Sequence, residues 1–136
     1  MTWLYNNEEF SELPENYYGF VYLITNNASG KKYFGKKLFY SQKQRQVKGK
    51  KKKYKVESDW KLYYGSNEEL ANDVSQNGVE AFTRVILKLC RTKGECSYFE
   101  AKYQFENDVL LHPELYYNSW VQCKIHRKHL KLSDAG

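Results

Sequence analysis

The sequence contains few residues that cross-link a chain or restrict its backbone: three cysteines and two prolines among 136 residues. It also contains no long apolar run. Cys90, Cys96 and Cys123 are odd in number and show no Cys-x-x-Cys spacing, so a disulfide framework is not indicated. No signal-peptide pattern and no membrane-length apolar stretch are present. These absences predict a reduced, soluble protein of the cytoplasm with no membrane partner.

Acidic residues are missing from one contiguous segment. Residues 31–55 hold 12 of the 22 basic residues and no Asp or Glu, so the rest of the chain contains 10 basic and 16 acidic residues. A solvated loop and a nucleic-acid-binding segment both fit such a charge run. The aromatic residues interleaved with it favour nucleic acid, bound mainly through its phosphates. These aromatic residues are Tyr33, Phe39, Tyr40 and Tyr54.

The pattern of apolar and turn residues predicts a single α+β domain over 1–136 with a small mixed or antiparallel sheet. Residues 1–17 form an acidic N-terminal extension and residues 121–136 a basic C-terminal tail. A β-hairpin is expected from strand Gly19–Thr25, the turn Asn26–Gly30 and the return strand Lys31–Lys37. The sequence shows no internal repeat and no second domain.

Further elements follow the hairpin. A short helix is expected at Tyr40–Val47, a single helical turn within Ser58–Ser66 capped by Ser58 or Asp59, and a helix at Asn67–Asn77. That helix begins at Ser66 or Asn67 as its cap and stops at Gly78. A third strand, Phe82–Leu89, alternates apolar and polar positions, and a long helix, Glu95–Leu111, ends before Pro113.

Two tyrosines stand out in the predicted hairpin. Tyr22 lies in the first strand and Tyr33 in the return strand, so both side chains can approach on one face of the sheet. Gly35 allows a backbone or a ligand to come close. Taken alone, the pair is explained either by cross-strand packing or by a functional site.

The residues around these tyrosines resemble a known family. GFVY at Gly19–Tyr22 followed by YFG at Tyr33–Gly35 is similar to the paired motifs of the GIY-YIG nuclease superfamily. The later segments SDWKLYYGS, NGVEAF, YFE and YYN are similar to those of its small phage-encoded, freestanding, homing-type endonucleases. The resemblance covers residues 18–120.

The resemblance implies a small three-stranded antiparallel sheet flanked by helices, and a DNA endonuclease that hydrolyses phosphodiester bonds with one divalent metal ion. Tyr22 and Tyr33 then line the site, and one of them acts as base or relays a proton. Glu100 holds Mg²⁺ or Mn²⁺, and Asn118 matches an Asn near the end of the domain. A Glu on a helix is also often a solvated residue, but the apolar neighbours of Glu100 favour a partly buried one.

Family members also carry an Arg about ten residues beyond the second motif tyrosine, where it binds the scissile phosphate. Lys43 occupies that spacing here and Arg45 follows two positions later. Arg45 is the preferred assignment, because a guanidinium binds a phosphate through two parallel hydrogen bonds. Lys37 and Lys43 remain candidates.

Other residues are expected to contact DNA or support the site. Lys36 and Lys37 follow Tyr33 closely and supply a positive field. Trp60 is expected in the core. His126 and His129 have the spacing of a zinc pair on a helix, but a basic tail is preferred because no Cys or carboxylate completes the set. The expected DNA-binding residues are Lys36, Lys43, Lys48, Lys50, Lys51, Lys52, Lys53, Tyr63, Tyr64 and Ser66.

Two other functions remain compatible with the sequence. One is a non-catalytic nucleic-acid-binding protein on the same fold, and the other is an interaction protein that uses the acidic N-terminus and an aromatic surface. A chain of this length leaves little room for a recognition domain, so modest sequence specificity is expected. We expect a monomer or a weak homo-oligomer on DNA, and a single site that cuts one strand at a time.

Overall fold

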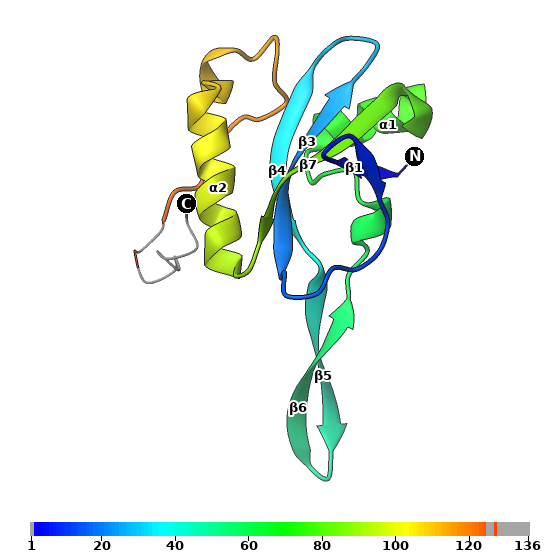
Figure 1. The fold of residues 1–136 in the computed structure, drawn as a ribbon, viewed down its shortest axis with the longest axis vertical. Coiled ribbons are helices and arrows are strands. Elements are labelled where there is room, and N and C mark those ends of the chain that lie inside the picture. Colours follow the sequence, from blue (N-terminus) through cyan, green and yellow to red (C-terminus); the bar gives the residue numbers. More distant parts are fainter. Residues whose placement is uncertain (1, 125–126, 128–136) are drawn as a thin grey trace.

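The computed structural model describes residues 2–124 and residue 127. A five-stranded sheet has the order β2-β1-β7-β3-β4, and a separate two-stranded ribbon, β5–β6, projects from it (Figure 1). The strands are β1 (Trp3–Tyr5), β2 (Glu8–Phe10), β3 (Gly19–Asn26), β4 (Lys32–Leu38), β5 (Tyr40–Val47), β6 (Lys50–Glu57) and β7 (Phe82–Cys90). The helices are α1 (Glu68–Asn77) and α2 (Lys93–Glu106), with short 3-10 turns at Trp60–Leu62, Val79–Ala81 and Val109–Leu111.

The centre of the sheet follows the sequence prediction. β3 lies between β4 and β7 and is antiparallel to both. Its residues from Gly19 to Tyr22 are buried without interruption, because helices and loops cover both faces. The predicted hairpin and third strand are therefore confirmed, and the α+β class holds.

The sheet has five strands and is mixed, which differs from the three-stranded antiparallel sheet that the family resemblance implied. Residues 3–10 form a hairpin, and β1 runs parallel to β7 with Leu4 beside Val85. The Trp3 side chain is buried and its Nε1 donates to the carbonyl of Trp60 at 2.7 Å. The acidic N-terminus is thus part of the sheet, because burial of Trp3 stabilises strands too short to show a period of their own.

The basic segment also differs from the prediction. Tyr40–Val47 is a strand, not a helix, and it pairs in full antiparallel register with β6. The two-residue turn Lys48–Gly49 has φ values of 49° and 77°. Positive φ at both central positions is the geometry that matches the twist of a tight hairpin. A Lys- and Gln-rich segment with good helix propensity is therefore drawn into a ribbon by its turn and its partner strand.

The two helices lie close to their predicted positions. Asn67 caps α1 by accepting a hydrogen bond from the Leu70 amide, and Gly78 ends it. α2 begins earlier than predicted because the Thr92 side chain accepts from the Glu95 amide. It also ends earlier than Leu111, at Glu106, because Asp108 takes a left-handed conformation and a 3-10 turn follows.

The helical turn expected within Ser58–Ser66 is present as the 3-10 turn Trp60–Leu62. Neither predicted cap makes a side-chain hydrogen bond to it. Ser58 instead donates to the carbonyl of Leu38 at 2.6 Å, which ties the end of β6 to the end of β4. Trp60 is fully buried, as predicted for a core residue.

Two apolar clusters hold the layers together. The larger one joins Trp3, Phe20, Phe39 and Trp60 on one face of the sheet, and the smaller one packs Val21 and other residues beneath α2. No helix within residues 2–124 is long and apolar enough to cross a membrane. Of the predicted tail 121–136, the structure describes residues 121–124 and 127, whereas His126 and His129 lie outside the described residues.

Candidate active site

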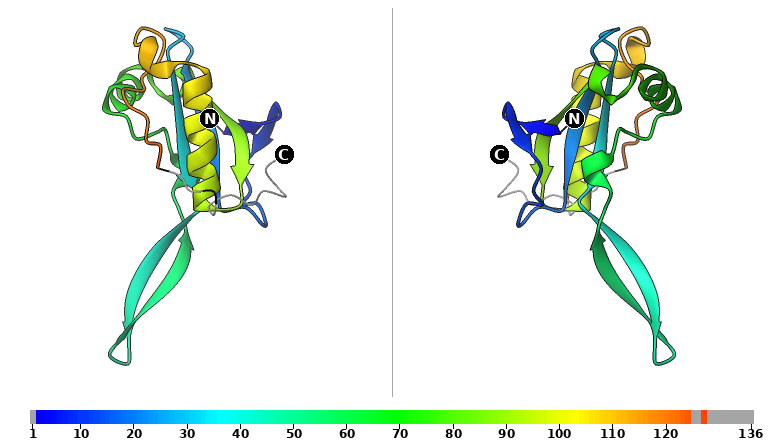
Figure 2. Two further views of the ribbon diagram at one scale, coloured as in Figure 1. Left: turned by 90° about the vertical axis from the view of Figure 1, so that its left-hand side faces the viewer. Right: turned by 90° about the vertical axis from the view of Figure 1, so that its right-hand side faces the viewer.

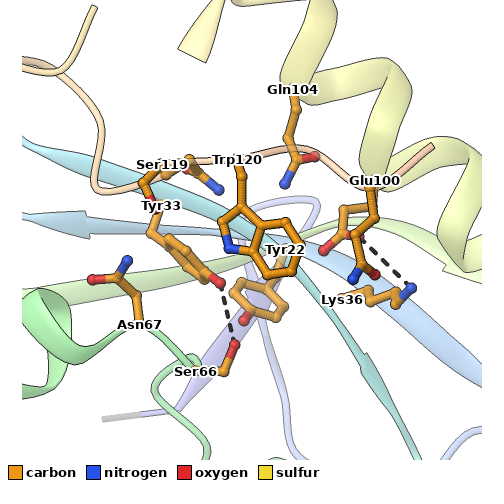
Figure 3. A pocket seen from close by; sticks show the side chains of 11 residues that line it. Tyr22, Tyr33, Lys36, Ser66, Asn67, Glu100, Gln104, Ser119 and Trp120 are labelled. Carbon is orange, nitrogen blue, oxygen red and sulfur yellow. Dashed lines mark hydrogen bonds and ion pairs between the residues drawn. The ribbon is translucent and has the colours of Figure 1, made fainter. Parts of the chain in front are cut away.

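A pocket of about 300 Å³ opens at the free edge of β4. Its walls come from β3, β4, α2, the start of α1 and the segment after α2 (Figure 3). The lining residues are Tyr22, Tyr33, Lys36, Ser66, Asn67, Glu100, Gln104, Asn118, Ser119, Trp120 and Gln122. Four residues predicted as catalytic, far apart in sequence, therefore meet here: Tyr22, Tyr33, Glu100 and Asn118.

The two tyrosines lie side by side because of the hairpin register. Tyr22 pairs with Gly35 and Ile24 with Tyr33, so the tyrosines are diagonal neighbours on one face. Their ring centroids are 6.2 Å apart. A Cβ at residue 35 would collide with the Tyr22 hydroxyl. Because Gly35 has no side chain, the Tyr22 hydroxyl can lie against the backbone of β4.

The environments of the two hydroxyls differ. Tyr22 is only 1% exposed, and burial raises its pKa well above the ordinary value, reinforced by the neighbouring Tyr63 and Tyr33 and by Glu100. Burial also raises the pKa of Tyr33, but the hydrogen bond between its hydroxyl and Ser66 Oγ, 3.2 Å long, opposes that rise. Both tyrosines hold their protons at neutral pH, and Tyr33 has the more polar surroundings.

Glu100 reaches the pocket from α2, with its side chain 17% exposed. The Lys36 Nζ lies 3.7 Å from its Oε1 and donates to Ser97 Oγ at 2.8 Å. Burial raises the pKa of Glu100, and the ammonium of Lys36 opposes that rise. Burial is the larger of the two effects on this pKa, so a further cation beside Glu100 would stabilise its charged form.

Asn118 is held at the edge of β4 by its side chain. Its amide accepts from the Phe34 N–H at 3.0 Å and donates to the Phe34 carbonyl at 2.8 Å, as a neighbouring strand would. The Tyr117 N–H donates to the Lys32 carbonyl alongside it. Gln104 also donates to the Phe34 carbonyl, at 3.3 Å. Asn118 therefore fixes the segment that carries Ser119 and Trp120 against the pocket.

A buried arginine supports the opposite wall. Arg84 on β7 donates from Nη1 to the carbonyls of Lys61 and Tyr63, at 3.0 and 2.9 Å. Its guanidinium lies 4.2 Å from the centre of the Tyr64 ring, and burial lowers its pKa. Arg84 thus fixes the loop that leads to Ser66, and Tyr64 packs on Arg84 instead of lining the pocket.

The cations predicted for the scissile phosphate do not line this pocket. Lys37 lies on the same face of β4 as Tyr33, but its ammonium pairs with Asp59 at 2.6 Å and lies 4.1 Å from the Tyr63 ring centre, outside the pocket. Arg45 is on β5 beside Tyr54, at 5.5 Å from the ring centre. Lys43 and the lysines at 48 and 50–53 also belong to the β5–β6 hairpin. Lys36, predicted as a DNA-binding residue, is the cation that lines the pocket.

Several pocket residues were not predicted from the sequence. Trp120 is 68% exposed and stands at the opening, with Tyr33 and Tyr22 beside it in Figure 3. Gln104 lies one helical turn after Glu100, so the i, i+4 spacing would have placed it on the same face of α2. Asn67, Ser119 and Gln122 complete the polar wall, and no sequence pattern distinguishes them.

A metal ion at this pocket would depend mainly on Glu100. No group of three His, Cys, Asp or Glu residues able to hold a metal occurs among residues 2–124 and 127. Mg²⁺ tolerates a single carboxylate because it keeps several waters and takes phosphate oxygens from its substrate. The partly buried carboxylate of Glu100, its raised pKa and the open polar pocket fit such an ion.

Comparison with known families agrees with the fold and the paired tyrosines. The family described as "putative endonuclease segE, GIY-YIG domain" matches residues 3–121. The chain therefore belongs to this GIY-YIG family, and the resemblance predicted from Tyr22 and Tyr33 is confirmed. No curated protein and no solved structure matches the chain.

Proposed function

We propose that the chain is a divalent-metal-dependent DNA endonuclease that hydrolyses phosphodiester bonds through one metal ion, Mg²⁺ or Mn²⁺, held by Glu100. The observation that carries the proposal is the convergence of a partly buried carboxylate, an ammonium and two tyrosine hydroxyls on one pocket. Membership of a family of endonucleases supports it. The substrate is DNA, bound mainly through its phosphates.

Glu100 and Lys36 supply the charges of the site. A divalent cation held by Glu100 would polarise the scissile phosphate and offset the negative charge that develops on it. Lys36 already lies beside that carboxylate at 3.7 Å. We assign its ammonium to a non-bridging phosphate oxygen, where it stabilises the same charge. This assignment replaces Arg45, Lys37 and Lys43, none of which lines the pocket.

The tyrosines act as neutral groups. The raised pKa of Tyr33 excludes a standing tyrosinate at neutral pH. Its hydroxyl can accept a hydrogen bond from the attacking water while it donates its own proton to Ser66, 3.2 Å away. Tyr33 thereby orients the water. As the water attacks, its proton passes to Tyr33 while the Tyr33 proton passes to Ser66, and the exposed Ser66 hydroxyl releases a proton to solvent. Tyr22 is deeper and supports the Tyr33 ring, so it is a positioning residue.

The alternative is a non-catalytic nucleic-acid-binding protein on the same fold. It is favoured by one observation: no Arg occurs among the described residues that line the pocket. A lysine lacks the bidentate geometry of a guanidinium, which makes the phosphate less well fixed. Such a protein would bind DNA tightly and cut none.

A plasmid-nicking assay separates the two functions. The protein is incubated with supercoiled plasmid and Mg²⁺ or Mn²⁺, with and without EDTA, and compared with Glu100→Gln and Glu106→Gln. We expect nicks that disappear with EDTA, at least a roughly 100-fold loss with Glu100→Gln, and normal nicking with Glu106→Gln. Glu106 is the matched control because it is an exposed Glu on the same helix, paired with Lys102 at 3.7 Å. Metal-independent nicking, or full activity of Glu100→Gln, would contradict the proposal.

The number of active sites also determines whether the first product is nicked or linear plasmid. One pocket with one metal ion cuts one strand at a time, so a monomer or weak homo-oligomer should release nicked circles before linear DNA. Linear plasmid that appears without a nicked precursor would show that two copies act together.

A further inference from the structure

The β5–β6 hairpin is a charged structure that is separate from the pocket. It projects from the body as a twisted ribbon (Figure 1). Residues 42–55 are all exposed except Val47, and they include eight basic residues and no acidic one. An isolated two-stranded ribbon is marginally stable at best in water. Exposed side chains on such a ribbon are accessible to a partner, and their positive charge favours a polyanion.

The strand register gives the ribbon two chemically different faces. Gln42, Gln44 and Gln46 of β5 lie directly opposite Lys55, Lys53 and Lys51 of β6, so these six residues share one face, here called the glutamine face. The opposite face pairs Lys43 with Tyr54, Arg45 with Lys52, and Val47 with Lys50. The glutamine face thus carries a row of amides beside a row of ammonium groups.

A row of glutamines is suited to reading base edges. A Gln amide both donates and accepts, and it pairs in a bidentate way with N6 and N7 of adenine in the major groove. Lysines reach guanine O6 and N7 or the adjacent phosphates. Alternate residues of a strand are about 6.7 Å apart, close to two base steps of about 3.4 Å. Neighbouring glutamines therefore match every second base pair along one strand.

The dimensions of the ribbon also match the major groove of duplex DNA. The major groove, about 12 Å wide, admits a two-stranded ribbon, and the minor groove, about 6 Å wide, does not. Eight residues extend about 26 Å, which is less than one helical turn of about 34 Å. In Figure 2 the hairpin leans to the side of the sheet that carries α1 and the segment after α2, which are walls of the pocket. One duplex can therefore meet both.

We propose that the β5–β6 hairpin lies in the major groove of duplex DNA with its glutamine face toward the base edges, and so gives this protein a sequence preference. The proposal rests on the proposed function for its choice of DNA as partner. It goes beyond phosphate attraction, because contacts to phosphates alone would bind any sequence equally. Lys55 lies at the base of the ribbon, 5.1 and 5.6 Å from the ring centres of Tyr18 and Tyr40, and anchors it.

The test is selection of binding sites from a random duplex library by the full chain in EDTA, where no cutting interferes. Two triple variants are compared: Gln42, Gln44 and Gln46 to Ala, and Lys43, Lys50 and Lys52 to Ala on the opposite face. We expect the wild type to enrich a motif of a few base pairs by about tenfold or more. The glutamine variant should lose that enrichment with an unchanged salt dependence. The lysine variant should keep the motif but bind more weakly. The slope of its log affinity against log salt should be shallower than that of the wild type, by up to about 0.9 for each phosphate that it no longer neutralises.

Methylation protection at guanine N7, an atom of the major groove, gives a second readout on the selected site. Protection by the wild type that is lost with the glutamine variant supports the proposal. Enrichment of no motif, a motif that survives the glutamine substitutions, or equal affinity for an RNA duplex with its narrow major groove would overturn it. Plasmid nicking by the glutamine variant with Mg²⁺ is measured in parallel. Absence of cutting would then contradict the proposed function, and absence of a sequence preference would contradict the proposal for the hairpin.

Discussion

The pocket and the β5–β6 hairpin carry the chemistry of this molecule in opposite ways. In the pocket, three polar groups have a defined neighbour: Tyr33 with Ser66, Glu100 with Lys36, and Asn118 with Phe34. On the hairpin, the side chains of residues 42–55 are exposed and mostly of one charge. Side chains held in a fixed geometry can position a reacting phosphate. Exposed basic side chains can bind a long polyanion without a fixed geometry. The comparison predicts that binding and cutting can be removed separately.

The largest effect should come from shortening the hairpin. Ser41 and Val56 are directly opposed, so residues 42–55 can be replaced by Asn-Gly, which closes a two-residue turn. We expect DNA affinity at moderate salt to fall on the order of 100-fold, because eight basic residues are lost. The melting temperature should change little. Unchanged affinity in a gel-shift titration would show that the hairpin does not bind DNA.

A substitution beneath the pocket should reduce cutting without reducing binding. In Gly35→Ala the new methyl group collides with the Tyr22 hydroxyl. Tyr22 cannot move away because Trp3, Phe20 and Tyr63 pack around its ring. We expect a loss of about 1–3 kcal/mol in the free energy of unfolding and about a tenfold or greater loss in nicking rate. Full activity at wild-type stability would show that the position of Tyr22 does not matter.

Asn118 tests whether the pocket wall is held by its amide. Asn118→Asp keeps the shape and the acceptor for the Phe34 N–H, but it cannot donate to the Phe34 carbonyl. We expect the free energy of unfolding to fall by about 1–3 kcal/mol in denaturant titrations, with reduced nicking because Trp120 is displaced. Asn107→Ala is the control, because it loses one exposed hydrogen bond to Tyr103. Equal effects of the two substitutions would contradict a special role for Asn118.

The smallest effect concerns the stability of the metal-free protein. Because burial raises the pKa of Glu100, the folded state holds that proton more tightly than the unfolded chain. This contribution to stability is present below the unfolded pKa of about 4.3 and is lost as pH rises through the higher folded pKa. In EDTA at pH 7, Glu100→Gln should therefore melt a few degrees higher than the wild type, and the difference should shrink below about pH 4. A lower melting temperature for Glu100→Gln at pH 7 would mean that the ion pair with Lys36 outweighs burial.

The sequence predicted the hairpin of β3 and β4 because Tyr22 and Tyr33 lie in two β-rich runs joined by a turn. The apolar spacing also predicted the helix that carries Glu100, whereas the site roles of Glu100 and Asn118 were implied by the family resemblance. The sequence did not show that the Asn118 amide completes the edge of β4, because a hydrogen bond across 84 positions leaves no local pattern.

The two mistaken elements have different physical causes. β1 and β2 hold three residues each, too few for a period, and their place depends on distant partners such as Val85 and Trp60. The β5 error came from helix propensity, although Gln42, Gln44 and Gln46 alternate with other side chains at the period of a strand. Lys48–Gly49 then marks the turn.

The most direct test is single-turnover cutting of one labelled duplex, with protein in excess and Mg²⁺ present, as a function of protein concentration. It compares the wild type, the hairpin-shortened variant and Glu100→Gln, with affinity measured on the same duplex in EDTA. We predict that the shortened variant reaches the wild-type plateau rate within about threefold, at a protein concentration at least about tenfold higher. Glu100→Gln should bind with wild-type affinity and cut at least about 100-fold more slowly. A shortened variant that binds normally but has lost its plateau rate, or a Glu100→Gln protein that cuts at the wild-type rate, would contradict this division between hairpin and pocket.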